Sequence, residues 1–335
     1  MKGFLKTLSP FAPDQSGAVG ALYELGGVIV ICDAGGCAGN ICGFDEPRWR
    51  TKKSAVFSAG LRDMDAVFGR DDQLIEKLKK AVHGDAAFTS VIGTPVPAVI
   101  GTDLRALDRL SERATGLPGV NVDTDGTALY DEGQRKAYKR LFDVFAADKF
   151  PVEKGRVGLV GVTPLEVSRL DADQKAKAVY GEGAFCAGFG SGLEEVRRMS
   201  ANEYNVAVGP SAVEACELLR ARFGTPYQKE YPFLPDGFDV PGANRTLIVA
   251  GQYAAEAIRA RCAGETRVAS WFRMDRALTK PGDARLETED DFIAFVRDFM
   301  PDVIVGDAYL KRAVPDFTGA WADLPQLAVS GRLID

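Results

Sequence analysis

Three evenly spaced cysteines follow a short apolar run near the start of this chain. The run, Val28 to Ile31, is rich in β-branched residues, as buried parallel strands are. Cys32, Cys37 and Cys42 come next, with glycine and alanine between them. Because glycine has no side chain, such a segment can bring backbone N–H groups close to a bound object. Thiolates with N–H groups near their sulfurs suit an iron–sulfur cluster, so the pattern predicts a cluster-binding loop.

We predict Cys32, Cys37 and Cys42 as metal ligands, and Gly36 and Gly39 as residues that contact the cofactor. The alternative for each cysteine is a buried thiol. Cys37 would then lie in a tight turn, Cys32 at the end of the strand and Cys42 at the start of a helix. With three thiolates, one chain offers one fewer than the four that a cubane cluster needs. Two cysteines from each of two copies would complete one [4Fe–4S] cluster, and three from each would suit a larger fused cluster. Either cluster would lie at the twofold interface of a homodimer.

Composition narrows the classes of function. A chain of 335 residues predicts two or three domains, and its net charge of −6 argues against a general nucleic-acid or membrane-surface binder. No apolar run is long enough to span a membrane and no signal peptide is visible, so we expect a cytoplasmic protein. Its six cysteines therefore indicate thiols or metal ligands rather than disulfides. The single histidine, His83, argues against histidine-based metal sites and against a Ser-His-Asp hydrolase.

Apolar strand patterns alternate with amphipathic helix patterns along the whole chain. In the first part, strands are expected at 28–31, 55–58, 88–93 and 119–123, with a helix at 133–147. This alternation predicts an α/β fold of three Rossmann-like units with parallel sheets. The predicted domains are 1–149, 150–243 and 244–335. The glycine-rich stretches at 158–162 and 188–192 do not match G-x-G-x-x-G, and no phosphate-binding P-loop occurs, so any ATP hydrolysis would belong to a partner.

Four stretches of this chain resemble the nitrogenase component 1 family. Their order and spacing, over most of residues 20 to 230, are similar to those of the family. The resemblance implies a nitrogenase component 1-like fold, with Cys37 as a ligand of an interfacial iron–sulfur cluster. The stretches are D-A-G-G-C at 33–37, D-M-D-A-V-F-G at 63–69, the segment 92–104 that ends V-I-G-T-D-L, and the segment 204–227 with Y-N-V and F-G-T-P-Y.

The chain also departs from the family at positions that hold metal. Thr94 or Pro95 replaces a family cysteine, so we place Thr94 at the cofactor. The cysteine that anchors the active-site metal cofactor of nitrogenase falls near Gly209, and His83 does not match the other anchor. The resemblance therefore implies an interfacial cluster, but not an iron–molybdenum cofactor held in the nitrogenase manner.

Other residues are candidates for roles beside the cluster. The family geometry would place Cys186, in the second glycine-rich stretch, at a cleft between domains, where it could serve a substrate; the alternative is a plain loop cysteine. Asp33 is a candidate proton relay, with a solvated carboxylate as its alternative. Arg48 could dock a reductase or form a surface ion pair. Cys216 and Cys262 lie on apolar helix faces, which predicts core positions.

The sequence thus leads to two functions of different classes. In the first, the chain is a nitrogenase-like oxidoreductase component that receives electrons from an ATP-dependent iron–sulfur reductase and reduces an unidentified small molecule. In the second, it is a scaffold that holds a metal cluster during assembly without turnover. A structural zinc site is a third hypothesis. The C-x4-C-x4-C spacing disfavours it, because common zinc sites use closely spaced cysteine pairs and histidines.

Overall fold

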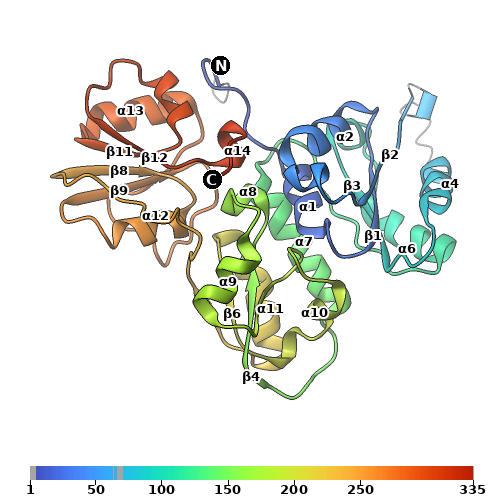
Figure 1. Ribbon diagram of the computed structural model, residues 1–335. Helices are drawn as coiled ribbons and strands as arrows, with labels where there is room; N and C mark the ends of the chain where they lie inside the picture. The colour runs from blue at the N-terminus through green and yellow to red at the C-terminus, as the bar shows by residue number, and fades with distance from the viewer. Residues whose placement is uncertain (1–4, 63, 66–70, 335) are drawn as a thin grey trace.

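Three separate parallel sheets make up the chain, each formed by one continuous stretch of sequence (Figure 1). The computed structural model describes residues 5–62, 64–65 and 71–334. The first sheet has the order β2-β1-β3, from β1 (Gly27–Ile31), β2 (Ala55–Ser58) and β3 (Phe88–Ile92). Its strands are parallel, with Val30 opposite both Phe57 and Val91. The predicted α/β class is confirmed.

The second and third sheets follow in the same manner. The second has the order β5-β4-β6-β7 and the third the order β10-β9-β8-β11-β12, with parallel pairing throughout. Each sheet lies inside one of the three predicted ranges, whose limits stay a prediction. The strands are β4 (Glu153–Val160), β5 (Ala184–Cys186), β6 (Asn202–Ala207), β7 (Tyr227–Lys229), β8 (Arg245–Val249), β9 (Glu265–Ser270), β10 (Ala284–Arg285), β11 (Val303–Gly306) and β12 (Ala320–Asp323).

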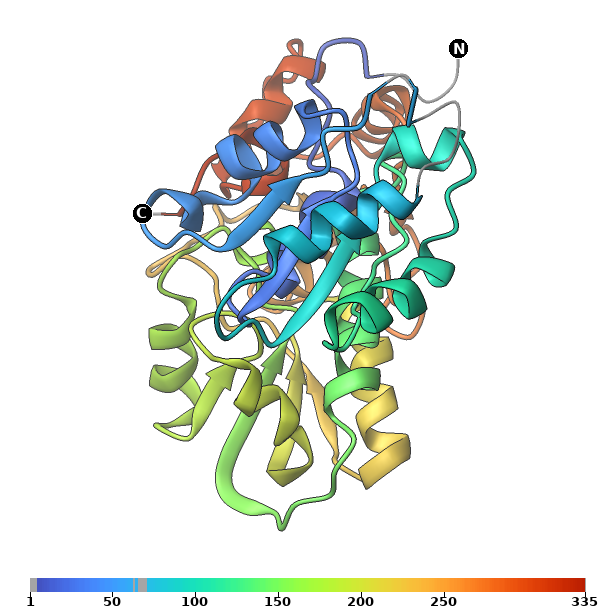
Figure 2. The same ribbon diagram turned by 90° about the vertical axis from the view of Figure 1, so that its right-hand side faces the viewer.

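Helices join and cover these strands, and two of them pack at the centre of the molecule, between the three sheets (Figures 1 and 2). A Cβ atom on Gly17 would lie 1.8 Å from the carbonyl oxygen of Tyr130, and one on Gly133 would lie 1.7 Å from that of Asp14. Only glycine permits this close approach of α1 and α7. The helices are α1 (Asp14–Leu22), α2 (Gly36–Asn40), α4 (Asp71–Ala81), α5 (Pro95–Val99), α6 (Leu104–Thr115), α7 (Tyr130–Phe145), α8 (Pro164–Val167), α9 (Ala172–Tyr180), α10 (Leu193–Arg197), α11 (Val213–Phe223), α12 (Gln252–Arg259), α13 (Glu289–Phe299) and α14 (Leu327–Ser330).

The strand expected at 119–123 is only partly formed. This segment runs parallel to β3 through the single bridges Thr89–Gly119 and Ile92–Val122. The side chain of Asn121 interrupts regular pairing, because its Oδ1 accepts a hydrogen bond from the N–H of Val91 at 2.7 Å. Val120 and Val122 are nevertheless buried, so the apolar pattern correctly identified a core segment.

The cysteine segment is helical, which corrects the prediction of a loop. Gly35 takes a φ of 116°, a conformation that favours glycine, and turns the chain from β1 into α2. A turn of π-helix, η1 (Ile41–Asp45), and a short 3-10 helix, η2 (Pro47–Arg50), continue it. Ile41 is fully buried and holds the segment against the core.

Arg48 is buried and ties this segment to the rest of the molecule, which corrects both roles expected for it. Its guanidinium forms ion pairs with Glu46 at 2.7 Å and Glu24 at 3.0 Å. It also donates hydrogen bonds to the carbonyl oxygens of Gly20 in α1, at 2.7 Å, and of Gly188 beyond β5, at 3.2 Å. The rings of Tyr23 and Phe189 lie 4.8 and 5.1 Å from it. The first and second units therefore meet around one cation.

We expect Arg48→Met to lower the free energy of unfolding by about 3–5 kcal/mol, because it leaves the buried carboxylate of Glu46 without its counter-ion and Glu24 with only the exposed Lys52. Urea unfolding followed by circular dichroism measures the change. Arg50→Met is the matched control, since Arg50 is exposed in the same short helix. Equal effects of the two substitutions would contradict the structural role of Arg48.

Candidate functional site

Cys37 lies in α2, just beyond the carboxyl end of β1, and is partly exposed. Its side chain packs against the core on one side and lines a large groove on the other. Burial, and after it the negative charge of Asp33, raises the pKa of this thiol. A metal that replaced the proton would therefore bind more strongly as pH rises.

Asp33 and Thr94 hold the backbone around Cys37. The two carboxylate oxygens of Asp33 accept hydrogen bonds from the N–H of Ala38 at 2.8 Å and from Ser58 Oγ at 2.5 Å. The buried hydroxyl of Thr94 donates to the carbonyl oxygen of Cys32 at 2.7 Å. These contacts join β1, β2 and α5 at the same edge of the sheet, so both residues fix the position of Cys37.

The other two cysteines of the segment differ from Cys37. Cys32 is buried in the core of the first unit, and this burial raises its pKa to about 12. Cys42 is partly exposed, and burial and then the charge of Glu46 raise its pKa. Within the described residues, no three histidine, cysteine, aspartate or glutamate side chains lie close enough to hold a metal ion. One copy of the chain therefore does not form a closed metal site from the parts described.

The glycines of the cysteine segment face open space. A Cβ atom on Gly36, Gly39 or Gly43 would have no atom within 4 Å, and none of the three has a positive φ. Neither the packing nor the backbone conformation of this chain therefore requires glycine there. Glycine inside a helix is less stable than alanine, so the structure leaves these three positions without an internal explanation.

Large apolar side chains are exposed around the same sheet edge. Val99, at the end of α5, is 87% exposed, and Phe44, in the π-helical turn, is 73% exposed. Phe57 in β2, Val96 and Ile100 are exposed to a lesser degree. These side chains belong to β2 and to the segments that follow β1 and β3, whose carboxyl ends share one edge. We call them, with Cys37, the apolar face.

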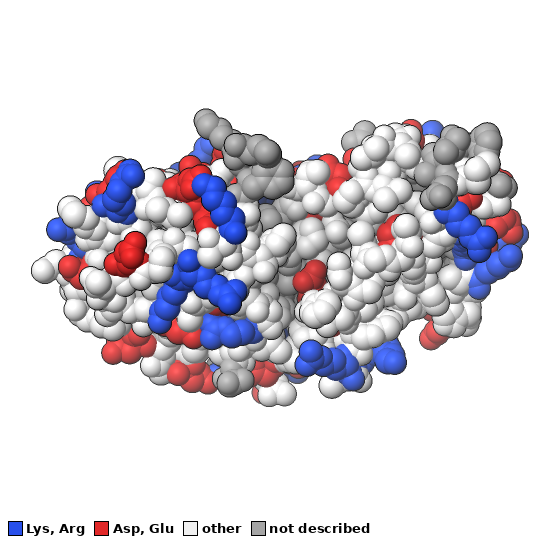
Figure 3. All heavy atoms as spheres, turned by 90° about the horizontal axis from the view of Figure 1, so that it is seen from above, with Lys and Arg blue, Asp and Glu red and all other residues white. Residues whose placement is uncertain are grey.

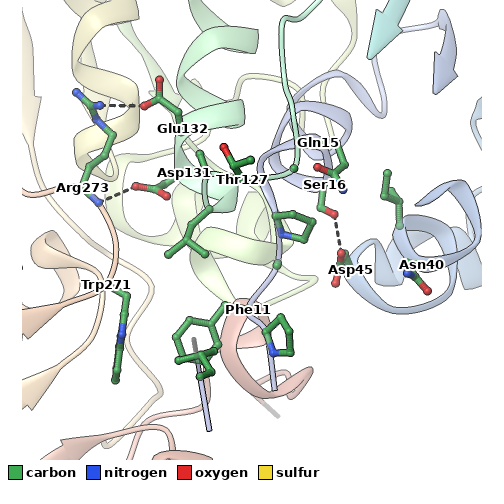
Figure 4. A pocket seen from close by; sticks show the side chains of 18 of the residues that line it. Phe11, Gln15, Ser16, Asn40, Asp45, Thr127, Asp131, Glu132, Trp271 and Arg273 are labelled. Atoms are coloured by element: carbon green, nitrogen blue, oxygen red, sulfur yellow. Dashed lines mark hydrogen bonds and ion pairs between the residues drawn. The ribbon is translucent and has the colours of Figure 1, made fainter. Parts of the chain in front are cut away.

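The groove beside Cys37 has a volume of about 1100 Å³ (Figure 4). One wall comes from α2 and η1, the opposite wall from residues 271–273 and 285–287 of the third unit, and the floor from residues 10–16 and the start of α7. Figure 4 shows Trp271 and Arg273 across the groove from Asn40 and Asp45. In the view from above, charged side chains are scattered over both ends of the molecule, while its middle is mostly uncharged (Figure 3).

The remaining cysteines lie away from this groove. Cys186 is fully buried in the core of the second unit, where its thiol donates to the carbonyl oxygen of Ala172 at 3.7 Å. It does not face a cleft, which corrects the placement expected for it. Cys216 is also fully buried, and Cys262 is partly buried against the third core, as predicted.

The junction near Gly209 offers no room for a metal cofactor. A Cβ atom on Gly209 would lie 2.6 Å from Glu166 Oε1, and the cavity that Glu166 lines holds only about 20 Å³, the space of a single water. Tyr130 donates a hydrogen bond to Glu166 at 3.1 Å. Burial, and then the charge of Asp131, raises the pKa of Glu166 to about 7.

Several residues of the groove were missed at the sequence level. Gln15, Asp131 and Trp271 come from three distant segments and carry no motif. Only the fold brings them together, so no local pattern could have identified them. Of the family-like stretch 63–69, residues 63 and 66–69 lie outside the described residues. No helix in the described part of the chain has both the length and the apolar character needed to cross a membrane.

Comparison with known proteins identifies the family. Residues 15–240 match the family described as nitrogenase component 1 type oxidoreductase. The nitrogenase iron-molybdenum cofactor biosynthesis protein NifE of Methanococcus maripaludis is 31% identical over 103 residues, which are 29% of this chain and 21% of that protein. The matching region thus spans about a fifth of the length of this curated relative.

Solved structures share the fold over almost the whole chain. The structure titled nitrogenase Cp1 at pH 6.5 has a TM-score of 0.71 and 10% identity, covering 97% of this chain and 87% of that one. The one titled nitrogenase Cp1 at pH 5 has a TM-score of 0.70 and 14% identity, covering 99% and 86%. At these identities the likeness concerns the fold. The family match covers more than half of the sequence, and the chain belongs to the nitrogenase component 1 type oxidoreductase family.

Proposed function

We propose that this chain is a nitrogenase-like oxidoreductase component that holds an iron–sulfur cluster between two copies of itself. The cluster receives electrons from an ATP-dependent iron–sulfur reductase, and the substrate, a small molecule, binds in the groove. The observation that carries the proposal is the position of Cys37, which lies between the open groove and the apolar face. A group bound to this thiol would be close to both a second copy and a substrate.

The surface around Cys37 supports the proposal that a second copy of the chain binds there and completes the site. Val99 and Phe44 would remove apolar area from water on association, which is the main driving force for obligate dimers. Gly36, Gly39 and Gly43 would allow a partner backbone or a cluster to approach the segment closely. Both features are unexplained within one chain and are explained together by an interface.

The donor set fits an iron–sulfur cluster shared by two chains. Cys37 and Cys42 are the two partly exposed thiols of the segment, so two copies would supply four. Cys32 is buried and would have to leave the core to become a ligand, which favours a [4Fe–4S] cluster over a larger fused one. When bound, such a cluster supplies single-electron transfer. Asp33 and Thr94 fix the segment that carries the ligands.

A scaffold without turnover is the second candidate function. Its support is the relative NifE, whose name describes iron-molybdenum cofactor biosynthesis and which matches 29% of this chain. The two functions differ in a measurable way. A scaffold passes its cluster to an acceptor protein that lacks one and reduces no substrate, whereas the redox component keeps its cluster through repeated reduction by the reductase.

Anaerobic purification of the wild type and of Cys37→Ala, followed by iron and sulfide analysis and electron paramagnetic resonance, tests the cluster. We expect about four irons for two chains in the wild type, and a loss of most of this iron in the variant. Cys262→Ala is the matched control, since Cys262 is partly exposed in the third unit, and it should retain the iron. Zinc in place of iron, or iron that Cys37→Ala retains, would contradict the proposal.

Gly39→Ala separates the interface from the stability of the single chain. Because its Cβ atom meets nothing within the chain, alanine should stabilise the isolated fold by up to about 1 kcal/mol. The same methyl group should weaken dimerisation and cluster retention, measured by analytical ultracentrifugation and iron content. Gly242→Ala, also in open space but in the loop before β8, should change neither. Unchanged dimerisation of Gly39→Ala would argue against this interface.

A further inference from the structure

Two buried polar atoms on opposite sides of the groove have no hydrogen-bond partner in the part of the chain that the structure describes. They are Gln15 Oε1, an acceptor, and Trp271 Nε1, a donor. The side chains are only 6% and 5% exposed, and both line the groove. Figure 4 shows Gln15 beside Ser16 on one side and Trp271 on the other. A ligand in the groove that supplies a donor and an acceptor would pair both atoms.

The charged side chains of the groove indicate the sign of the charge on that ligand. Four carboxylates line it, those of Asp45, Asp131, Glu132 and Glu287, against the guanidinium groups of Arg273 and Arg285. Arg273 pairs with Glu132 at 2.9 Å, which leaves three carboxylates for one cation.

Asp45 and Asp131 are the carboxylates that most need a positive partner. Asp45 accepts a hydrogen bond from Ser16 Oγ at 2.6 Å, and Asp131 accepts one from the backbone N–H of Arg273 at 2.6 Å. Among the described residues neither forms an ion pair, although Arg285 and Arg273 both attract the charge of Asp131. Burial raises the pKa of both carboxyl groups, because it removes water from the charged form. A ligand cation would balance their charge.

Aromatic and aliphatic side chains form the rest of the lining. Trp271 packs against Phe11 edge to face, with ring centroids 5.2 Å apart. Phe44, Leu129 and Leu286 add apolar surface around the same space. Aromatic rings beside carboxylates are the environment that organic cations prefer, since the ring faces attract positive charge. At about 1100 Å³ the groove is at or above the upper end of the ordinary range for small-molecule sites.

From these observations we propose that the groove binds a nitrogenous organic cation with an aromatic or apolar body. Positively charged nitrogen groups of the ligand lie near Asp45 and near Asp131, which Figure 4 shows on opposite sides of the groove. An N–H group of the ligand donates to Gln15 Oε1, and an acceptor on the ligand pairs with Trp271 Nε1. Binding of this class of ligand is independent of any metal cluster. That such a ligand is the substrate rests on the function proposed above.

Fluorescence titration with proflavine, an aromatic cation that carries amino groups, tests the proposal. We expect saturable binding to the wild type, weaker by about tenfold or more in Asp45→Asn and Asp131→Asn, since each loses a charge-assisted contact. Gln15→Leu should weaken binding several-fold. Asn keeps the acceptor that Ser16 and Arg273 use, so these variants should fold, which circular dichroism checks. Asp316→Asn, exposed and outside the groove, is the matched control and should bind as the wild type does.

A second dye and the same variants give the results that would contradict the proposal. Anilinonaphthalene sulfonate, an aromatic anion, should bind more weakly than proflavine. If it binds more tightly, or if Asp45→Asn and Asp131→Asn bind proflavine no differently from Asp316→Asn, the cation site is wrong. Wild-type protein freed of iron by a chelator should bind proflavine as the iron-loaded protein does. This result keeps failure of the groove proposal separate from failure of the cluster proposal.

Discussion

The buried guanidinium of Arg48 is the interaction on which the arrangement of the candidate site depends. It joins the end of the cysteine segment to α1 through Gly20, to Glu24 just beyond that helix, and to the second unit through Gly188. A buried ion-pair network contributes little net stability, but removing one member leaves unpaired charge, so the geometry that satisfies all members is strongly preferred. That geometry sets the direction in which α2 and η1 leave the first sheet, and with it the position of Cys37.

Sequence patterns predicted the fold well because the buried strands β1 and β3 are short apolar runs that can be read locally. Cys37 stays a predicted ligand, which the sequence could propose because its segment directly follows β1. Local patterns failed where a long-range contact decides the outcome. The cysteine segment forms helices because Asp33 and Ile41 anchor it, and Arg48 is buried because its partners come from α1 and the second unit. Cys186 looked accessible in the sequence, yet its strand is covered on both faces.

One chain completes part of the candidate site and leaves other parts of its surface open. The junction beside Gly209 is complete, because the carboxylate of Glu166 fills it. The apolar face and the groove on either side of Cys37 are open, and each carries groups that the chain itself does not satisfy. A second copy would cover the apolar face, and a ligand would pair with the polar atoms of the groove. A cluster on Cys37 would then lie between an electron source and a bound molecule.

Native mass spectrometry of anaerobically purified protein tests this account most directly, because it weighs the assembly and the cluster together. The account predicts a dimer whose mass exceeds that of two chains by one [4Fe–4S] cluster, and which separates into metal-free single chains when iron is chelated. A metal-free monomer under every anaerobic condition, or a dimer that carries zinc, would contradict it.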